Sequence, residues 1–136
     1  MVQKKIKASE HDEQCIFIKW CDLNKIPVYS NPNGIYMPVP KFLPANYQSI
    51  LRSTVSKILS KMKKEGAFRK GLPDITIPVA SNGYGALYIE MKIKGNYATK
   101  EQKQYMEMLE KNGNKCVVCY GSFEAIQVTK EYLQGK

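Results

Sequence analysis

The sequence predicts a single α/β domain in which a mixed β-sheet is flanked by helices. Segments with helical spacing of apolar residues alternate with short apolar segments, in the order helix, strand, helix, hairpin, helix, strand, helix. A length of 136 residues is usual for one domain, so we expect residues 1–136 to share one core. Hydrophobic residues make up 43% of the chain and charged residues 24%, a balance typical of globular proteins.

The first helix is expected to begin after Ser9 and to end near Leu23. Ser9 can cap the helix, and Asp12 three residues later completes an arrangement like a capping box. The apolar residues recur at steps of three and four and so share one face: Ile16, Phe17, Trp20 and Leu23. Residues 26–44 contain most of the prolines and the turn signal Asn31-Pro32-Asn33-Gly34, which predicts a strand, a turn and an irregular connection.

A second helix is predicted from about Ala45 to Lys64, with Gly66 placed to end it. One face carries an apolar stripe of Leu51, Val55, Ile58 and Met62. A second face is basic, since three lysines repeat at helical spacing: Lys57, Lys61 and Lys64. This row is either a solvated helix face or a stripe that follows the phosphates of a nucleic acid.

Short apolar segments follow from Leu72 onward. Residues 74–80 and 86–94 are expected to pair as a hairpin across the turn Ser-Asn-Gly-Tyr-Gly. Thr99 is placed to cap a helix that ends near Lys111. Residues 115–120, KCVVCY, are apolar on both faces, which predicts a central strand. A last helix is expected from Ser122 to about Leu133.

The net charge of +9 indicates a polyanionic partner, and nucleic acid is the first candidate. A basic ribosomal or membrane-surface protein would share this bias. We expect a soluble, cytoplasmic protein, because no segment is long and apolar enough to span a membrane and the N-terminus does not resemble a signal peptide. Cys116 and Cys119 have the spacing of zinc ligands, but there is no second such pair and His11 is the only histidine, so buried thiols are the better interpretation.

Three charged residues of the hairpin are the candidates for chemistry. Glu90 and Lys92 are two residues apart on one strand, so both side chains point to the same face. Asp74 begins the partner strand, and a hairpin closed at Gly83-Tyr84-Gly85 would place it near residue 93. The alternative is a solvated aspartate and an ordinary ion pair on the sheet surface.

Such a set suits the hydrolysis of phosphodiester bonds. Two carboxylates can hold a divalent cation such as Mg²⁺ through oxygen ligands, and the cation polarises the phosphoryl oxygens and activates water. A lysine can position that water and offset the negative charge that develops. Two alternatives remain for the whole chain: a basic module that binds DNA or RNA without catalysis, and a restriction-type or tRNA-directed nuclease, which has a different substrate class, on the same scaffold.

The pairs Pro73-Asp74 and Glu90-Met91-Lys92 resemble the signature of the PD-(D/E)xK nuclease superfamily. With the residues around them, roughly 65–128, they are similar to its virus-type replication-repair (VRR-NUC) branch; Ser9–Gln14 and Asn31–Gly34 resemble it more loosely. The resemblance implies a restriction-endonuclease-like core and a Mg²⁺- or Mn²⁺-dependent, structure-selective DNA endonuclease. Homodimers with Holliday-junction-resolvase-like activity occur in this branch, whose members of this length are typical of phages, prophages and bacteria.

The resemblance also implies roles for individual residues. Asp74 and Glu90 would be metal ligands together with the backbone carbonyl of Met91, and Lys92 would be the catalytic lysine. Gln102 matches a family glutamine that holds the lysine or a water on the metal, although Thr99 and Gln102 also form a capping box. A glutamate of the first helix would complete the metal shell: we favour Glu13, which shares the face of Ile16, Phe17 and Trp20, and keep Glu10 as the alternative.

Other residues are candidates for contacts with DNA or with a second copy. Arg69 and Lys70 precede the Gly-Leu-Pro-Asp turn, where they would contact a phosphate next to the scissile one or be solvated loop residues. Tyr97 and Tyr105 would line a DNA groove, although Tyr105 also suits the core. We expect a homodimer, because a four-way junction needs paired cuts, with residues 28–50 as the candidate dimerisation or lid region.

Overall fold

The computed structural model describes residues 7–32 and 37–135. Its contacts divide the chain into two compact units, a core unit of Met1–Asn31 with Gly71–Lys136 and a helical unit of Pro32–Lys70. Residues Asn33 and Gly34 of the expected turn lie outside the described residues. A single domain over the whole chain stays a prediction.

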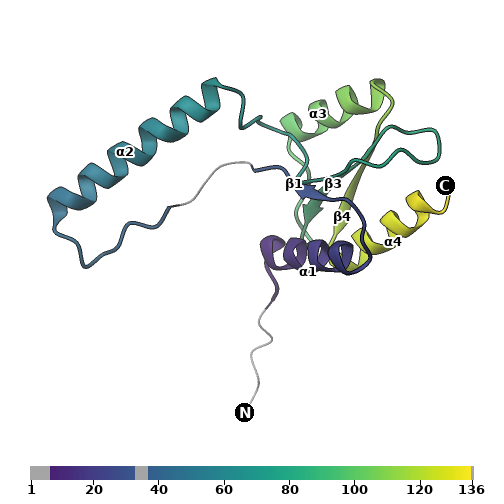
Figure 1. The fold of residues 1–136 in the computed structure, drawn as a ribbon, viewed down its shortest axis with the longest axis horizontal. Helices are drawn as coiled ribbons and strands as arrows, with labels where there is room; N and C mark the ends of the chain where they lie inside the picture. Colours follow the sequence, from purple (N-terminus) through teal and green to yellow (C-terminus); the bar gives the residue numbers. More distant parts are fainter. Residues whose placement is uncertain (1–6, 33–36, 136) are drawn as a thin grey trace, which may run out of the picture. The chain divides into compact units, whose positions relative to one another are not determined.

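The core unit contains a mixed four-stranded sheet, which confirms the predicted fold class. The strands follow the order β1 (Tyr29–Ser30), β2 (Ile75–Ile77), β3 (Leu87–Lys92) and β4 (Lys115–Tyr120). The first three strands pair antiparallel, whereas β3 and β4 are parallel and are joined by helix α3 (Lys100–Lys111). The expected order of helices and strands is confirmed (Figure 1).

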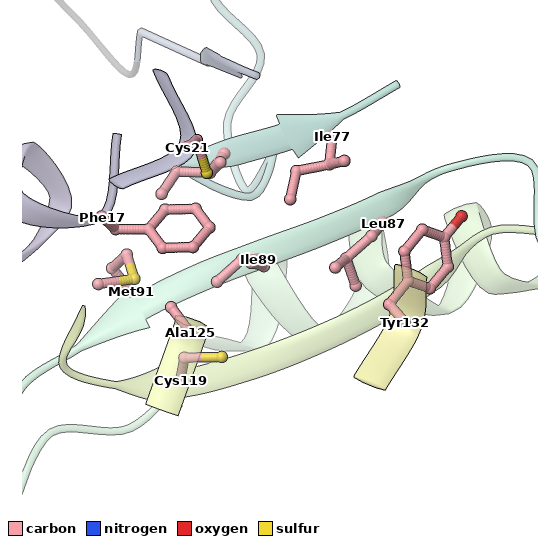
Figure 2. Packing of buried hydrophobic residues seen from close by; sticks show 10 residues of the cluster. Phe17, Cys21, Ile77, Leu87, Ile89, Met91, Cys119, Ala125 and Tyr132 are labelled. Carbon is pink, nitrogen blue, oxygen red and sulfur yellow. The ribbon is translucent and has the colours of Figure 1, made fainter. Parts of the chain in front are cut away.

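The prediction that residues 115–120 form a central strand is wrong, because β4 lies at the edge of the sheet and pairs with β3 alone. Both faces of β4 are apolar because a helix covers each of them. Helix α3 packs on one face and helix α4 (Ser122–Leu133) on the other. Cys116 on the α3 side donates a hydrogen bond to the Met106 carbonyl, and Cys119 lies in the core (Figure 2). Burial raises the pKa of both thiols to about 12.

The main core lies between the sheet and helices α1 (Glu10–Leu23) and α4. Alternate residues of β3 point into it, and they pack with side chains of both helices: Leu87, Ile89 and Met91 with Phe17, Cys21, Ala125 and Tyr132 (Figure 2). Because strand side chains alternate, Glu90 and Lys92 point to the opposite face, the one that α3 covers. The predicted capping box of Ser9 and Asp12 is confirmed.

The hairpin has a different register from the expected one. Asn82 and Gly83 form the turn, with φ of 50° and 81°, between Ser81 and Tyr84, which pair as an isolated bridge. Such left-handed positions suit Asn-Gly. Ile75 pairs with Ile89, so one step further along the strands Asp74 stands opposite Glu90 rather than near residue 93. The turn closes earlier than expected, and this brings the two carboxylates together.

The helical unit contains one helix, α2 (Ala45–Lys64), as the sequence predicts. None of its residues is buried, and large apolar side chains such as Tyr47, Ile50 and Ile58 are more than half exposed. The helix ends at Lys64, and Gly66, two residues later, has a φ of 83°. None of the helices in the described parts of the chain is both long and apolar enough to cross a membrane.

Candidate active site

Asp74, Glu90 and Lys92 meet on the face of the sheet that α3 covers. An Asp74 carboxylate oxygen accepts a hydrogen bond of 2.8 Å from the backbone N–H of Met91. The Lys92 ammonium donates to Glu90 Oε1 at 2.8 Å. Glu90 is 1% exposed and the Lys92 side chain 11%, so this is not the solvated ion pair that the sequence also allowed.

The pKa values of both carboxyl groups are raised, so each group favours a bound proton or a nearby cation over an unbalanced negative charge. Burial, followed by the neighbouring Asp74, raises the pKa of Glu90 to about 7, although Lys92 opposes the shift. Burial also raises the pKa of Asp74. Within the described residues, Glu90 Oε2 is buried and has no hydrogen-bond partner. A buried carboxylate oxygen is costly without a partner, and either a proton shared with Asp74 or a cation would satisfy it.

Lys92 stays charged at neutral pH despite its burial. Burial disfavours the ammonium, but the hydrogen bond to Glu90 and the negative charges of Glu90, Glu10 and Asp74 outweigh it and raise the pKa of Lys92. Lys92 is therefore a fixed cation and a hydrogen-bond donor rather than a base. A fixed cation in a water-poor site stabilises negative charge more strongly than one in bulk water.

Gln102 forms the expected capping box, and its side chain also bonds Glu90 rather than the lysine. Its side-chain oxygen accepts from the backbone N–H of Thr99 at 2.8 Å and so completes the capping box of α3. Its side-chain nitrogen donates to Glu90 Oε1 at 2.6 Å. One amide thus begins the helix and orients a buried carboxylate.

Of the two glutamates on α1, Glu10 lies nearer to the charged cluster. Its charge acts on both Asp74 and Lys92, and its carboxylate accepts from the Asn96 side chain at 3.3 Å. Glu13 instead accepts from the backbone N–H of Ser122 at 2.7 Å, where it caps the N-terminus of α4. Hydrogen bonds from Ser122 lower the pKa of Glu13. These contacts favour Glu10 over Glu13 as the neighbour of the cluster, while the metal-binding role of either glutamate stays a prediction.

The chemistry of the cluster fits a hard divalent cation. Asp74 and Glu90 offer carboxylate oxygens, and one of these oxygens is buried without a partner. Across the described residues no three His, Cys, Asp or Glu side chains are grouped closely enough to hold a metal. Two protein carboxylates, with water in the other positions, are typical of Mg²⁺ sites.

A family model described as the VRR-NUC domain matches residues 8–123. The chain belongs to the VRR-NUC family. A solved structure described as a VRR_NUC domain protein is 26% identical and superposes with a TM-score of 0.70, over 95% of this chain and 91% of that one. No curated protein sequence matches the chain. VRR-NUC is a nuclease family, and the matched range contains every residue of the charged cluster from Glu10 to Gln102.

The VRR-NUC site opens into a depression of about 540 Å³. It is lined by Glu10 and Lys92 and by three residues of the loop after β3: Gly95, Asn96 and Tyr97. The depression is open to solvent, so a polymeric substrate can enter it from the side. Lys92 lies in the wall of this depression.

Asn31 also helps to position the residues of the VRR-NUC site, although the sequence predicts only its place in a turn. Its backbone N–H donates to the Asp74 carbonyl at 2.7 Å. Its side-chain nitrogen donates to the Pro73 carbonyl at 2.7 Å and to the Thr76 hydroxyl at 2.8 Å. Asn31 thus fixes the backbone on both sides of Asp74, and only the fold brings these segments together.

Replacing Asn31 by alanine is expected to lower the free energy of unfolding by about 1–3 kcal/mol, because the Pro73 carbonyl and the buried Thr76 hydroxyl lose their donor. Urea denaturation would measure the loss. Asn24→Ala is the matched control, since it removes one exposed bond to the Trp20 carbonyl. Equal losses in the two variants would contradict a special role of Asn31.

Gly71 lets the chain approach the first turn of α3 closely beside the site. Its φ is 86°, and a Cβ there would lie 2.5 Å from the Glu101 carbonyl oxygen and 3.1 Å from the Gln102 nitrogen. Both the backbone conformation and this close approach require glycine. The chain therefore packs tightly against the first turn of α3, next to the amide that holds Glu90.

The five basic residues predicted to bind DNA lie in the helical unit rather than in the core unit: Lys57, Lys61, Lys64, Arg69 and Lys70. Lys57, Lys61 and Lys64 are exposed on α2, and Lys61 forms a long ion pair of 3.8 Å with Glu65. The Arg69 guanidinium lies against Gly66. Their role toward DNA stays a prediction.

Proposed function

We propose that this VRR-NUC protein is a Mg²⁺- or Mn²⁺-dependent endonuclease that hydrolyses phosphodiester bonds in branched DNA. The observation that carries the proposal is the pair of the buried Glu90 and the half-buried Asp74 beside the Lys92 ammonium. A carboxylate pair of this kind is costly to bury without a counter-charge. A divalent cation would provide that charge.

In the proposed mechanism Asp74 and Glu90 hold the cation, and the Met91 carbonyl is the candidate backbone ligand. When bound, Mg²⁺ or Mn²⁺ polarises the phosphoryl oxygen and lowers the pKa of the attacking water. Lys92 donates a hydrogen bond to that water or to the phosphate and offsets the developing charge. Gln102 keeps Glu90 oriented, which fixes the ligand before substrate binds.

Glu10 takes the place of the helix glutamate in this proposal. It lines the depression beside Lys92 and acts on the charge of Asp74. Since its side chain does not form a three-ligand group with the other two, it would reach the cation through water. Glu13 is assigned to the support of α4.

The proposal of DNA as substrate, in branched form, rests on charge. The net charge is +9, and α2 contains one arginine and four lysines but no acidic residue. Such a helix suits phosphate contacts that weaken with salt. A homodimer with two sites related by a twofold axis would suit paired cuts in a Holliday junction, with residues 28–50 as its candidate interface.

The test is cleavage of a panel of substrates: a four-way junction, a flap, a splayed arm, a duplex and a single strand. With Mg²⁺ or Mn²⁺ we expect products from the branched substrates, and none with EDTA. Asp74→Asn should bind DNA without cutting it, whereas Asp22→Asn, at an exposed site on α1, should cut normally. Salt-dependent binding without any product would instead support a non-catalytic nucleic-acid-binding module.

The homodimer can be tested separately by light scattering at micromolar concentration. A dimeric mass of about twice 15.5 kDa is expected. A monomeric mass would contradict the paired-site arrangement while leaving the cleavage chemistry untouched.

A further inference from the structure

Tyr97 is an aromatic residue at the edge of the site that the proposed chemistry does not use. Its side chain is 79% exposed, and it lines the depression that also contains Lys92 and Glu10. A ring so exposed contributes little to the stability of the fold, since most of its apolar surface stays in water. The ring is therefore placed to contact a molecule that enters the depression.

Hydrogen bonds hold the loop in place on both sides of Tyr97. The backbone N–H of Asn96 donates to the Ile93 carbonyl at 3.0 Å, and the Asn96 side chain donates to Glu10 at 3.3 Å. On the other side, Thr99 begins α3 with its capping box. The ring is thus presented from a fixed backbone, which reduces the entropy lost when a ligand packs on it.

The space beside the ring is open. Gly95 has a φ of 97°, and a Cβ added there would meet no atom within 4 Å. The depression thus combines a fixed ammonium, free space and an exposed aromatic face. A nucleotide offers the complementary groups, a phosphate and a flat base.

We propose that Tyr97 is a stacking platform for an unpaired base next to the scissile phosphate. A base inside a duplex already stacks on both faces, so only an unpaired or terminal base has a face free for the ring. The class of substrate is therefore DNA with unpaired nucleotides beside a duplex, such as a splayed arm or a flap. This inference rests on the proposed nuclease function and narrows its substrates to splayed arms and flaps, which leaves out a fully paired four-way junction.

The test uses 2-aminopurine, a fluorescent base that is quenched by stacking, at the first unpaired position of a splayed-arm DNA. The full chain is mixed with this DNA in Ca²⁺, another oxygen-liganded cation, in place of Mg²⁺. We expect quenching with the unchanged protein and with Tyr97→Phe, but not with Tyr97→Ala. Tyr97→Ala should also bind the splayed arm roughly tenfold more weakly, since each stacked base contributes about 1–3 kcal/mol.

Phe123→Ala is the matched control, because Phe123 is 75% exposed on α4 and does not line the depression. Its binding and quenching should equal those of the unchanged protein. Quenching that persists in Tyr97→Ala would overturn the inference. So would a protein that cuts branched DNA with Mg²⁺ but never quenches the probe, and this result would leave the proposed function standing. A protein that cuts no DNA with either metal would overturn both.

Discussion

A protein in which Lys92 is replaced by methionine is expected to cut DNA at least about a hundredfold more slowly while keeping its fold. Methionine fills a similar volume along the sheet but has no donor and no charge. The Lys92 ammonium is held in place by its hydrogen bond to Glu90. We expect no other described residue of the cluster to replace it as a cation. The rate of product formation from a branched substrate at saturating Mg²⁺ would measure the effect.

Lys94→Met is the matched control, because Lys94 lies two residues further along and is exposed. Its rate should stay within a few-fold of the unchanged protein. Thermal unfolding of both variants would show that the fold is intact. Full activity of Lys92→Met in a folded protein would remove Lys92 from the mechanism.

A second large effect is expected on the free energy of unfolding, which should depend on pH and on divalent metal through Glu90. Without divalent cations, the free energy of unfolding is expected to fall as the pH rises from about 4.5, the ordinary pKa of glutamate, to about 7, its raised pKa in the fold. In this range the folded protein keeps the proton that the unfolded chain has lost. The raised pKa of Asp74 acts in the same direction. Urea denaturation in EDTA across this range would measure the slope.

Mn²⁺ should reverse this loss near neutral pH. A ligand that binds only the folded protein stabilises it by about 2.7 kcal/mol at a concentration of a hundred times its Kd. Glu90→Gln should weaken both the pH dependence and the stabilisation by Mn²⁺, because the buried ionisable group is gone. Glu107→Gln, at an exposed position of α3, is the control and should retain both. A Glu90→Gln variant stabilised by Mn²⁺ as strongly as the unchanged protein would rule out Glu90 as a ligand.

The local features of the site could be predicted from the sequence. The two-residue period of a strand is enough to place Glu90 and Lys92 on one face, and the Asn-Gly pair is enough to expect a hairpin. The register was missed because it depends on which residues close the turn. Asp74 lies opposite Glu90 because the turn is formed by Asn82 and Gly83 and because the pairing shifts by one residue between the Ser81–Tyr84 bridge and the strands.

The choice between Glu10 and Glu13 could not be made from the sequence. Both lie on α1, three residues apart, and so share one side of the helix. The argument for Glu10 comes from Ser122, whose N–H donates to Glu13 and which lies more than a hundred residues further along the chain. In the same way, two flanking helices make β4 apolar on both faces, which the sequence alone cannot distinguish from a central strand.

The helical unit is a segment inserted between two anchored points of the core unit. The chain leaves the core unit after Asn31, which is bonded to Asp74, and returns at Gly71, three residues before Asp74. The two ends of the intervening segment are therefore close together and each is held by its own contacts. Because loop closure depends only weakly on length, such a segment can be lengthened, shortened or exchanged at little entropic cost. A change in the length of this segment should therefore leave Asp74 and the carboxylate beside it in place.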